Sequence, residues 1–247
     1  MSYEESAQYY DSFDTKGNLP FYLDLAGRTD GKVLELGVGT GRVLFEMARL
    51  GREVVGIDNS VAMLREAKRK RREDYPEVCG KCRLVLADML SFDLGERFGL
   101  VYSASAGVQS ASADDLRGTF RSAASHLEEG GVFAFDVASP HSMRQTKAFG
   151  PDRQEQPGGR VVIRFIAQTW RPSTDTVSYD ILFKEHIPGR TSTVTVKETS
   201  ETAVITVEAI EDALDYAGLK ANEMYGDFKG SPYTEESKYI VVVAGRK

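Results

Sequence analysis

The glycine-rich stretch at residues 32–42 constrains this chain more than any other part of its sequence. It reads Lys-Val-Leu-Glu-Leu-Gly-Val-Gly-Thr-Gly-Arg, a short apolar run that ends in a turn with glycine at every second position. The apolar spacing from Val43 to Leu50 then predicts an amphipathic helix. Glycines permit positive φ angles and close backbone approach, while a helix N-terminus presents unpaired N–H groups and the positive end of its dipole. A strand, a glycine turn and a helix in this order predict a nucleotide-sized binding site.

The spacing of the glycines bears on which ligand is bound. Dinucleotide-binding enzymes use the pattern G-x-G-x-x-G, whereas Gly37, Gly39 and Gly41 give G-x-G-x-G, with Glu35 before them. This stretch resembles the glycine motif of the class I S-adenosylmethionine (SAM)-dependent methyltransferases. The resemblance implies that SAM is the cofactor, that S-adenosylhomocysteine is its product and that Glu35 and the three glycines contact it. A nicotinamide-binding fold and a tight turn without a ligand are the alternatives.

Two further carboxylates follow predicted strands. Residues 53–58 form an apolar run that ends in Asp58, and an acid at this distance past a glycine turn can accept hydrogen bonds from both ribose hydroxyls of a nucleotide. We include the adjacent Asn59 in the same site. The family's adenine contact is a carboxylate after the third strand, with an apolar neighbour against the ring. The resemblance therefore assigns this role to Asp88 and Met89, with a plain turn as the alternative.

The alternation of strands and helices continues to residue 137. We expect strands over 83–89, 98–104 and 132–137, and a helix over 114–127 that the run Glu128-Glu129-Gly130-Gly131 ends. Ligands of parallel sheets bind beyond the carboxyl ends of the strands. The exit of the fourth strand, Ser103 to Gln109, is therefore expected to border the point of methyl transfer, and Ser103 is included in the cofactor site.

The pattern changes after the fifth strand. Residues 140–159 are polar and rich in glycine and proline, which predicts a loop. Residues 160–202 carry alternating β-branched and aromatic residues with turn signals between them, which predicts two or three antiparallel strands. We expect them to fold over the ligand-binding edge of the sheet as a cap.

The last part of the chain completes the sheet. A helix is expected over 206–218, capped by Thr206, followed by strands over 219–227 and 238–244. The predicted fold class is α/β, and the resemblance implies a Rossmann-like seven-stranded sheet in the order 3-2-1-4-5-7-6. The expected domains are a SAM-binding core with an N-terminal lid helix (1–138), an antiparallel β cap (139–202) and a C-terminal helix and hairpin that complete the core sheet (203–247).

The N-terminal segment carries a second family-like motif. Residues 4–14 have helical spacing, and Ala7, Tyr10 and Asp11 match in order the "A-x-x-Y-D" segment that covers the cofactor in small-molecule members of the family. The resemblance implies a lid in which Tyr10 contacts the cofactor. Simple packing of aromatic residues on the domain is the alternative.

The acceptor side has no equally specific motif. The chain is similar to small-molecule methyltransferases with a cap after the fifth strand, including sugar-amine and glycine N-methylating enzymes, and it lacks the N-P-P-Y motif that holds planar nitrogens. Transfer to an N or O atom by in-line displacement requires mainly orientation and exclusion of water. No nucleophilic side chain, catalytic residue or metal is therefore assigned. The candidates for the acceptor pocket are Tyr10, Gln109, His141, Tyr179, His186 and Tyr233.

The net charge of the chain bears on which binding partners are expected. The formal charge of −6 and the pI of about 5.3 disfavour a nucleic-acid partner, which usually meets a basic face. A basic run at residues 68–72 follows Arg65, and we interpret it as a solvated helix end. An RNA-modifying methyltransferase, which would use this run, and a non-catalytic partner protein with the same fold are the alternatives to a small-molecule enzyme.

The remaining signals indicate an ordinary cytoplasmic chain. Cys79 and Cys82 form a C-x-x-C without a second cysteine pair, and the favoured interpretation is two reduced thiols rather than a zinc or redox site. No apolar run is long enough to span a membrane, and residues 1–5 lack the apolar core of a secretory signal. A homodimer is left open.

Overall fold

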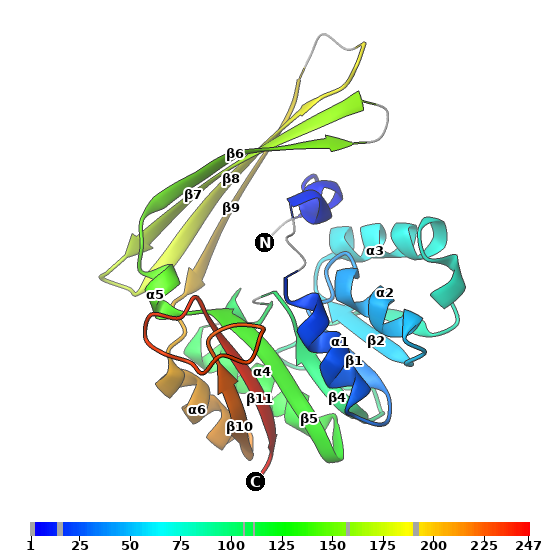
Figure 1. Ribbon diagram of the computed structural model, residues 1–247, viewed down its shortest axis with the longest axis vertical. Coiled ribbons are helices and arrows are strands. Elements are labelled where there is room, and N and C mark those ends of the chain that lie inside the picture. Colours follow the sequence, from blue (N-terminus) through cyan, green and yellow to red (C-terminus); the bar gives the residue numbers. More distant parts are fainter. Residues whose placement is uncertain (1–2, 14–16, 106, 111, 157–158, 190–192) are drawn as a thin grey trace.

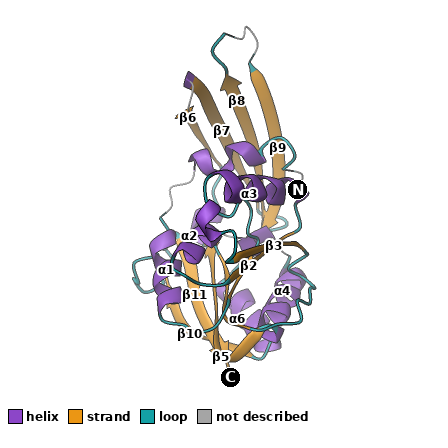
Figure 2. Cartoon of the chain, turned by 90° about the vertical axis from the view of Figure 1, so that its right-hand side faces the viewer, coloured by secondary structure: helices purple, strands orange, loops and turns teal. Residues whose placement is uncertain are grey.

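The computed structural model describes residues 3–13, 17–105, 107–110, 112–156, 159–189 and 193–247. In these residues the chain forms a seven-stranded sheet covered by helices and a four-stranded sheet that rises from it (Figure 1). A view turned by 90° shows the strands of the second sheet standing above the first (Figure 2).

The seven-stranded sheet has the predicted order 3-2-1-4-5-7-6. In spatial order its strands are β10 (Leu219–Tyr225), β11 (Tyr239–Arg246), β5 (Leu127–Ala138), β4 (Phe98–Ser103), β1 (Val33–Leu36), β2 (Val54–Asp58) and β3 (Cys82–Leu86). Among them β11 alone runs antiparallel to its neighbours. The carboxyl ends of β1 to β5 therefore meet at one edge, which is where ligands of such sheets bind.

Helices cover both faces of this sheet. The helices are α1 (Leu19–Gly27), α2 (Arg42–Arg49), α3 (Val61–Glu73), α4 (Ala113–Ser125), α5 (Pro140–Met143) and α6 (Val207–Tyr216), with 3-10 turns η1 (Ala7–Phe13), η2 (Pro76–Val78) and η3 (Gly107–Ser110). Buried side chains of α1, α2 and α3 form one apolar cluster with the sheet, and those of α4 and α6 form another. Ser60 and Thr206 cap α3 and α6 as predicted, since their hydroxyls accept from Met63 and Ala209 N–H.

The second sheet, which we call the cap, has more strands than predicted. Its strands are β6 (Lys147–Gln156), β7 (Arg160–Arg171), β8 (Thr176–His186) and β9 (Val194–Ala203), paired in that order. The prediction of a loop over 140–159 was wrong, because this segment forms α5 and β6. An edge strand tolerates proline and charged residues, and Pro151 lies where the β6–β7 register shifts.

A second correction concerns residues 128–131, which we expected to end a helix. The helix ends at Ser125, and β5 already begins at Leu127. Leu127 pairs with Phe98 and Val132 pairs with Leu100, so the intervening residues form an irregularity in the strand. Gly130 has a φ of 74°, which glycine adopts without strain. The glycine pair therefore marks a bulge and not a helix terminus.

Close packing between α2 and the sheet depends on Gly56 in the middle of β2. A Cβ atom placed there would lie 2.5 Å from a methyl group of Leu44 and 2.6 Å from one of Val38. Overpacking of this kind typically costs about 1–3 kcal/mol. We expect Gly56→Ala to lower the free energy of unfolding in urea by about that amount. Gly80→Ala is the control, since a Cβ at Gly80 meets nothing within 4 Å; equal effects of the two changes would contradict the packing argument.

Candidate functional site

The glycine turn lies between the end of β1 and the start of α2. Gly37, Gly39 and Gly41 have φ angles of 71°, 53° and 84°, which L side chains rarely adopt. A Cβ on Gly41 would come within 2.5 Å of the Phe45 ring, so this glycine is needed for packing. A Cβ on Gly39 would meet nothing within 4 Å. The backbone at Gly39 therefore faces open space, as a ligand-binding turn must.

Asp58, at the end of β2, is joined to this turn. Its Oδ2 accepts from the Gly39 N–H at 2.8 Å, and its Oδ1 accepts from the Ser60 N–H at 2.8 Å. Burial raises the pKa of Asp58, and these two N–H groups offset part of that shift. Because each carboxylate oxygen can accept more than one hydrogen bond, both remain able to bind hydroxyl groups of a ligand.

Glu35, like Ser103, is buried. It is 3% exposed, and its Oε2 accepts from the Tyr102 hydroxyl at 2.8 Å. Burial raises the pKa of Glu35 to about 8, although the Tyr102 hydroxyl, Arg42 and the Leu44 N–H act in the opposite direction. These contacts place Glu35 beneath the glycine turn, where it supports the turn and the start of α2.

A second buried carboxylate is Asp136, near the end of β5. The sequence analysis did not include it among the predicted site residues. Its Oδ1 accepts from the Tyr22 hydroxyl at 2.6 Å and from the Ser105 N–H at 3.0 Å. The Tyr22 ring lies 5.2 Å from that of Tyr102, so the two phenol–carboxylate pairs are adjacent. Asp136 lies in the predicted strand over 132–137, and its position in the sequence gave no local signal for a role in the site.

The exit of β4 is held by polar contacts that the sequence analysis did not predict. Ser105 has a positive φ of 57°, and its hydroxyl accepts from Asn18 Nδ2 at 3.0 Å and from the Arg42 guanidinium at 2.7 Å. The Ser103 hydroxyl donates to the Leu36 carbonyl at 3.0 Å and is buried. Ser103 therefore joins β4 to β1 at the edge of the predicted site.

The remaining predicted cofactor residues lie at the ends of β2 and β3. Asn59 and Asp88 are exposed, and Asp88 Oδ1 accepts from the Leu90 N–H at 3.0 Å. Met89 is half-buried, and its methyl carbon would lie 3.2 Å from a Cβ on Gly37. Met89 therefore borders the first glycine of the turn.

The segment η1 lies between the core and the cap (Figure 1). On the core side Asp11 accepts from the Thr40 hydroxyl at 2.7 Å and binds Lys70 of α3. On the cap side the Tyr9 ring stacks on Phe183 at 5.3 Å. Tyr10 is 47% exposed and packs edge-on against Tyr3. The segment η1 therefore contacts both the core, through Asp11, and the cap, through Tyr9, and the lid role stays a prediction.

The predicted acceptor-pocket residues are spread over several elements. The Gln109 amide donates to the Ala138 carbonyl and accepts from the Ala138 N–H, so it ties η3 to β5. Tyr179 is half-buried on β8, with its hydroxyl 3.2 Å from the Met143 sulfur. Tyr233 is half-buried against the α4–α6 side of the core. His141 and His186 are exposed on α5 and at the end of β8.

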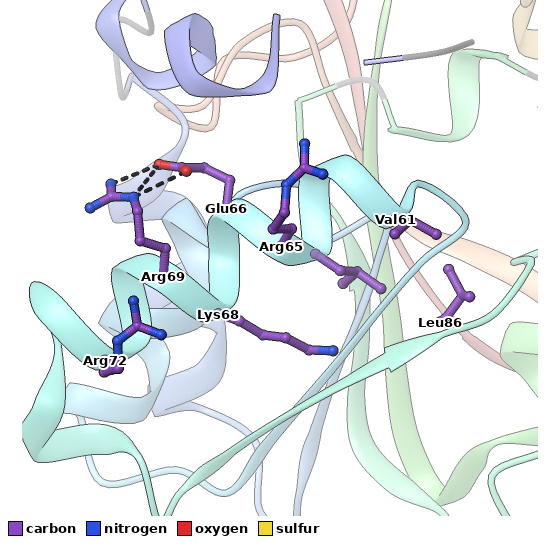
Figure 3. Close-up of a pocket in the computed structure, with 8 residues that line it drawn as sticks. Val61, Arg65, Glu66, Lys68, Arg69, Arg72 and Leu86 are labelled. Atoms are coloured by element: carbon purple, nitrogen blue, oxygen red, sulfur yellow. Dashed lines mark hydrogen bonds and ion pairs between the residues drawn. The ribbon is translucent and has the colours of Figure 1, made fainter. Parts of the chain in front are cut away.

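A groove of about 640 Å³ runs along the outer side of α3 beside Leu86 of β3 (Figure 3). It contains much of the basic run. Carboxylates bind several of these cations: Arg69 contacts Glu66, Glu73 and Asp74, Arg72 contacts Glu73, and Lys70 contacts Asp11. Phosphate groups would have to compete with these carboxylates.

Cys79 precedes β3, Cys82 is the first residue of that strand, and both are free thiols. Cys79 is exposed, whereas burial raises the pKa of the Cys82 thiol to about 11. Among the described residues no three His, Cys, Asp or Glu side chains are grouped so that they could hold a metal ion. No helix in the same residues is long and apolar enough to cross a membrane.

Part of the core sheet matches a known protein family. Residues 33–131 match the family model described as "Methyltransferase domain". The chain is 29% identical to the cypemycin N-terminal methyltransferase of a Streptomyces species over 225 residues, which cover 90% of this chain and 85% of the relative. These similarities confirm the predicted resemblance to the SAM-dependent methyltransferases.

Two solved structures share the whole architecture. A SAM-dependent methyltransferase from Clostridium acetobutylicum aligns with a TM-score of 0.81 and 22% identity, covering 99% of this chain and 98% of that one. The SAM-bound amino pentose methyltransferase CalS10 from Micromonospora echinaspora aligns with a TM-score of 0.74 and 21% identity, covering 98% and 95%. At identities this low the structural likeness shows the fold alone. It confirms the predicted seven-stranded sheet with its antiparallel cap.

We expect Asp58→Ala to weaken SAM binding at least tenfold, because the change removes the predicted acceptor for two ribose hydroxyls. Hydrogen bonds to charged groups are worth about 1.5–3 kcal/mol each, and about 1.4 kcal/mol corresponds to tenfold in affinity. Isothermal titration calorimetry measures the dissociation constant. The control is Asp30→Ala, an exposed aspartate in the turn before β1. An Asp58 variant that binds SAM like the parent would place the ribose site elsewhere.

The raised pKa of Glu35 predicts that the free energy of unfolding depends on pH. Its pKa in the folded protein, about 8, lies above the ordinary value of 4.5, so the folded state holds this proton more tightly. The corresponding stability is complete below about pH 4.5 and is lost as the pH rises through about 8. Denaturant unfolding from pH 6 to pH 9 should therefore show Glu35→Gln gaining stability relative to the parent. A difference that does not change with pH would refute the buried titration.

Proposed function

We propose that this protein transfers a methyl group from SAM to an N or O atom of a small-molecule acceptor bound between the core and the cap. The observation that carries the proposal is the cap itself, because it stands over the edge where the parallel strands end (Figure 1). The side of β8 that stacks on η1 carries Val177, Tyr179, Ile181 and Phe183, and a small-molecule pocket is usually lined mainly by apolar and aromatic side chains. The names of two relatives, an N-terminal methyltransferase and an amino pentose methyltransferase, support acceptors of this kind.

The residues at the strand ends fit SAM. The Asp58 carboxylate can accept from both ribose hydroxyls, and the open backbone at Gly39 lets the cofactor approach closely. We assign Asp88 and Met89 to the adenine and Tyr10 to the lid, as the family motifs imply. Ser103 and Glu35 shape the site from below through their contacts with Leu36 and Tyr102.

The catalytic contribution of the chain is positioning and exclusion of water. SAM supplies a methyl group already activated by its sulfonium, so the acceptor lone pair forms the new bond while the carbon–sulfur electron pair goes to sulfur. Holding the two reactants in line can supply roughly 7–11 kcal/mol of the barrier. The segment η1 and the cap keep solvent away from this point by packing Tyr9 against Phe183.

The alternatives have less support. An RNA-modifying enzyme would use the basic run, but carboxylates of the same region already bind many of its cations. A non-catalytic partner protein would have a damaged cofactor site, whereas Asp58, Asp88 and the three glycines are all present. The homodimer stays a prediction.

The proposed function is tested by transfer of a labelled methyl group from SAM to a panel of amines, alcohols and phenols. We expect labelled product with at least one small-molecule class and none with RNA. Labelling of RNA alone would favour the RNA-modifying alternative. SAM binding without transfer to any member of the panel or to RNA would favour the non-catalytic alternative.

A steric block tests where the acceptor binds. Ser200 lies on the side of β9 that faces the core, opposite Tyr179, while Thr195 is exposed on the other side of the same strand. We expect Ser200→Trp to lower kcat/KM for the acceptor at least tenfold with less than a twofold change in SAM affinity, because the indole fills the acceptor space. Thr195→Trp is the matched control. Equal activity of the two variants would mean that this side of the cap does not bind the acceptor.

A further inference from the structure

Helix α4 and its C-cap carry a line of three residues along the segment that joins β3 to β4. Gly118, Ser122 and His126 are spaced four apart, so they follow one side of the helix. A Cβ atom on Gly118 would lie 3.3 Å from the Leu90 carbonyl oxygen, and the Ser122 hydroxyl donates to that same oxygen at 3.0 Å. The segment 87–97, which we call the β3–β4 loop, therefore packs directly on this side of α4.

His126 holds the later part of the β3–β4 loop. It is 4% exposed, and its Nε2 accepts from the Leu94 N–H at 3.1 Å. Because Nε2 accepts, Nδ1 carries the ring proton and donates to the Ser122 carbonyl at 2.8 Å. The ring also stacks on Phe92, with the two centroids 4.3 Å apart. The loop is therefore fixed to the end of α4 by a hydrogen bond and by a ring contact.

The first residues of the β3–β4 loop lie at the predicted cofactor site. The Ala87 N–H donates to the Asp58 carbonyl at 3.1 Å, which joins the start of the loop to the end of β2. Met89 borders Gly37 of the glycine turn, since a Cβ there would lie 3.2 Å from its methyl carbon. Asp88 stands between these two contacts and is exposed. The position of the loop therefore decides where the Asp88 carboxylate lies relative to the turn and to Asp58.

Two hydrogen bonds connect Ser122 to that carboxylate through Leu90. The Ser122 hydroxyl donates to the Leu90 carbonyl, and the Leu90 N–H donates to Asp88 Oδ1 at 3.0 Å. The Ser91 N–H donates to the Asp88 carbonyl at 3.1 Å, which closes the turn. An exposed carboxylate has several rotamers open to it unless a hydrogen bond holds one of them. The buried Ser122 therefore holds the turn that orients Asp88.

We propose that Ser122 and His126 are positioning residues, which hold the β3–β4 loop so that Asp88 accepts a hydrogen bond from the 6-amino group of the cofactor's adenine. Such a bond weakens steeply when the oxygen leaves the line of the N–H, so its strength depends on how well the loop is held. A site built around this amine disfavours a base that lacks it. The inference rests on the proposed function, since it concerns the base of the proposed methyl donor.

The test compares two ligands on the complete protein by isothermal titration calorimetry. One is S-adenosylhomocysteine, and the other is its 6-deamino analogue, in which hydrogen replaces the amino group of the adenine. We expect the parent to bind S-adenosylhomocysteine at least fivefold more tightly than the analogue. Ser122→Ala should reduce this ratio to within twofold and change the affinity for the analogue less than twofold. A general loss of stability would instead weaken both ligands by the same factor and leave the ratio unchanged.

Ser125→Ala is the matched control, because the Ser125 hydroxyl donates to the Ser122 carbonyl within the same helix. It should keep the parental ratio. His126→Phe keeps a ring beside Phe92 but cannot accept from Leu94, and it should lower the ratio, whereas His126→Gln supplies an acceptor oxygen and should restore it. The proposal is overturned if the parent shows no preference, if Ser122→Ala or His126→Phe keeps the parental ratio, or if Ser125→Ala lowers it equally.

Failure of this proposal differs from failure of the proposed function. If the parent transfers labelled methyl to a small molecule but Ser122→Ala keeps the parental ratio, the proposed function stands and the positioning role falls. If the ratio responds as expected but neither a small molecule nor RNA is methylated, the positioning role stands and the proposed function falls.

Discussion

The hydrogen bond from the Gly39 N–H to the Asp58 carboxylate is the contact on which the rest of the site depends. It joins the turn after β1 to the end of β2 across 2.8 Å, so the two elements that we propose bind the nucleoside part of SAM are fixed relative to each other. Glycine adopts the required φ without strain and leaves the backbone open on its other side. Beneath it, Glu35 and Tyr102 fill the space between the turn and β4.

The same turn also positions the N-terminal segment. Thr40 of the glycine turn donates to Asp11, and Lys70 of α3 binds the other oxygen of that carboxylate, so η1 is tied to both the turn and α3. Tyr9 then connects η1 to the cap through Phe183 and Glu185. The cofactor edge, the segment above it and the cap therefore form one continuous set of contacts.

Sequence patterns predicted the core well because each of its elements has a strong local signal. The buried runs that end in Glu35-Leu36 and Asp58, and the caps Ser60 and Thr206, are short-range features, and the strand order followed from the resemblance. The cap was predicted less completely. The signal of β6 was hidden by Gly150 and Pro151, which an edge strand tolerates but which also indicate loops. The role of Asp136 depends on contacts with Tyr22 and Ser105, each more than thirty residues away, and local spacing does not reveal such contacts.

The cap has its own hydrogen-bonded framework, with β6 to β9 paired only with one another. Cap side chains that do not contact η1 or Gln109 can therefore be exchanged without breaking the strand pairing of the core sheet. This separation makes the fold evolvable: duplicated copies of such a gene can drift toward new acceptors while donor binding is inherited unchanged. The same modularity offers a route to laboratory recombination, in which caps from different relatives are grafted onto one common base.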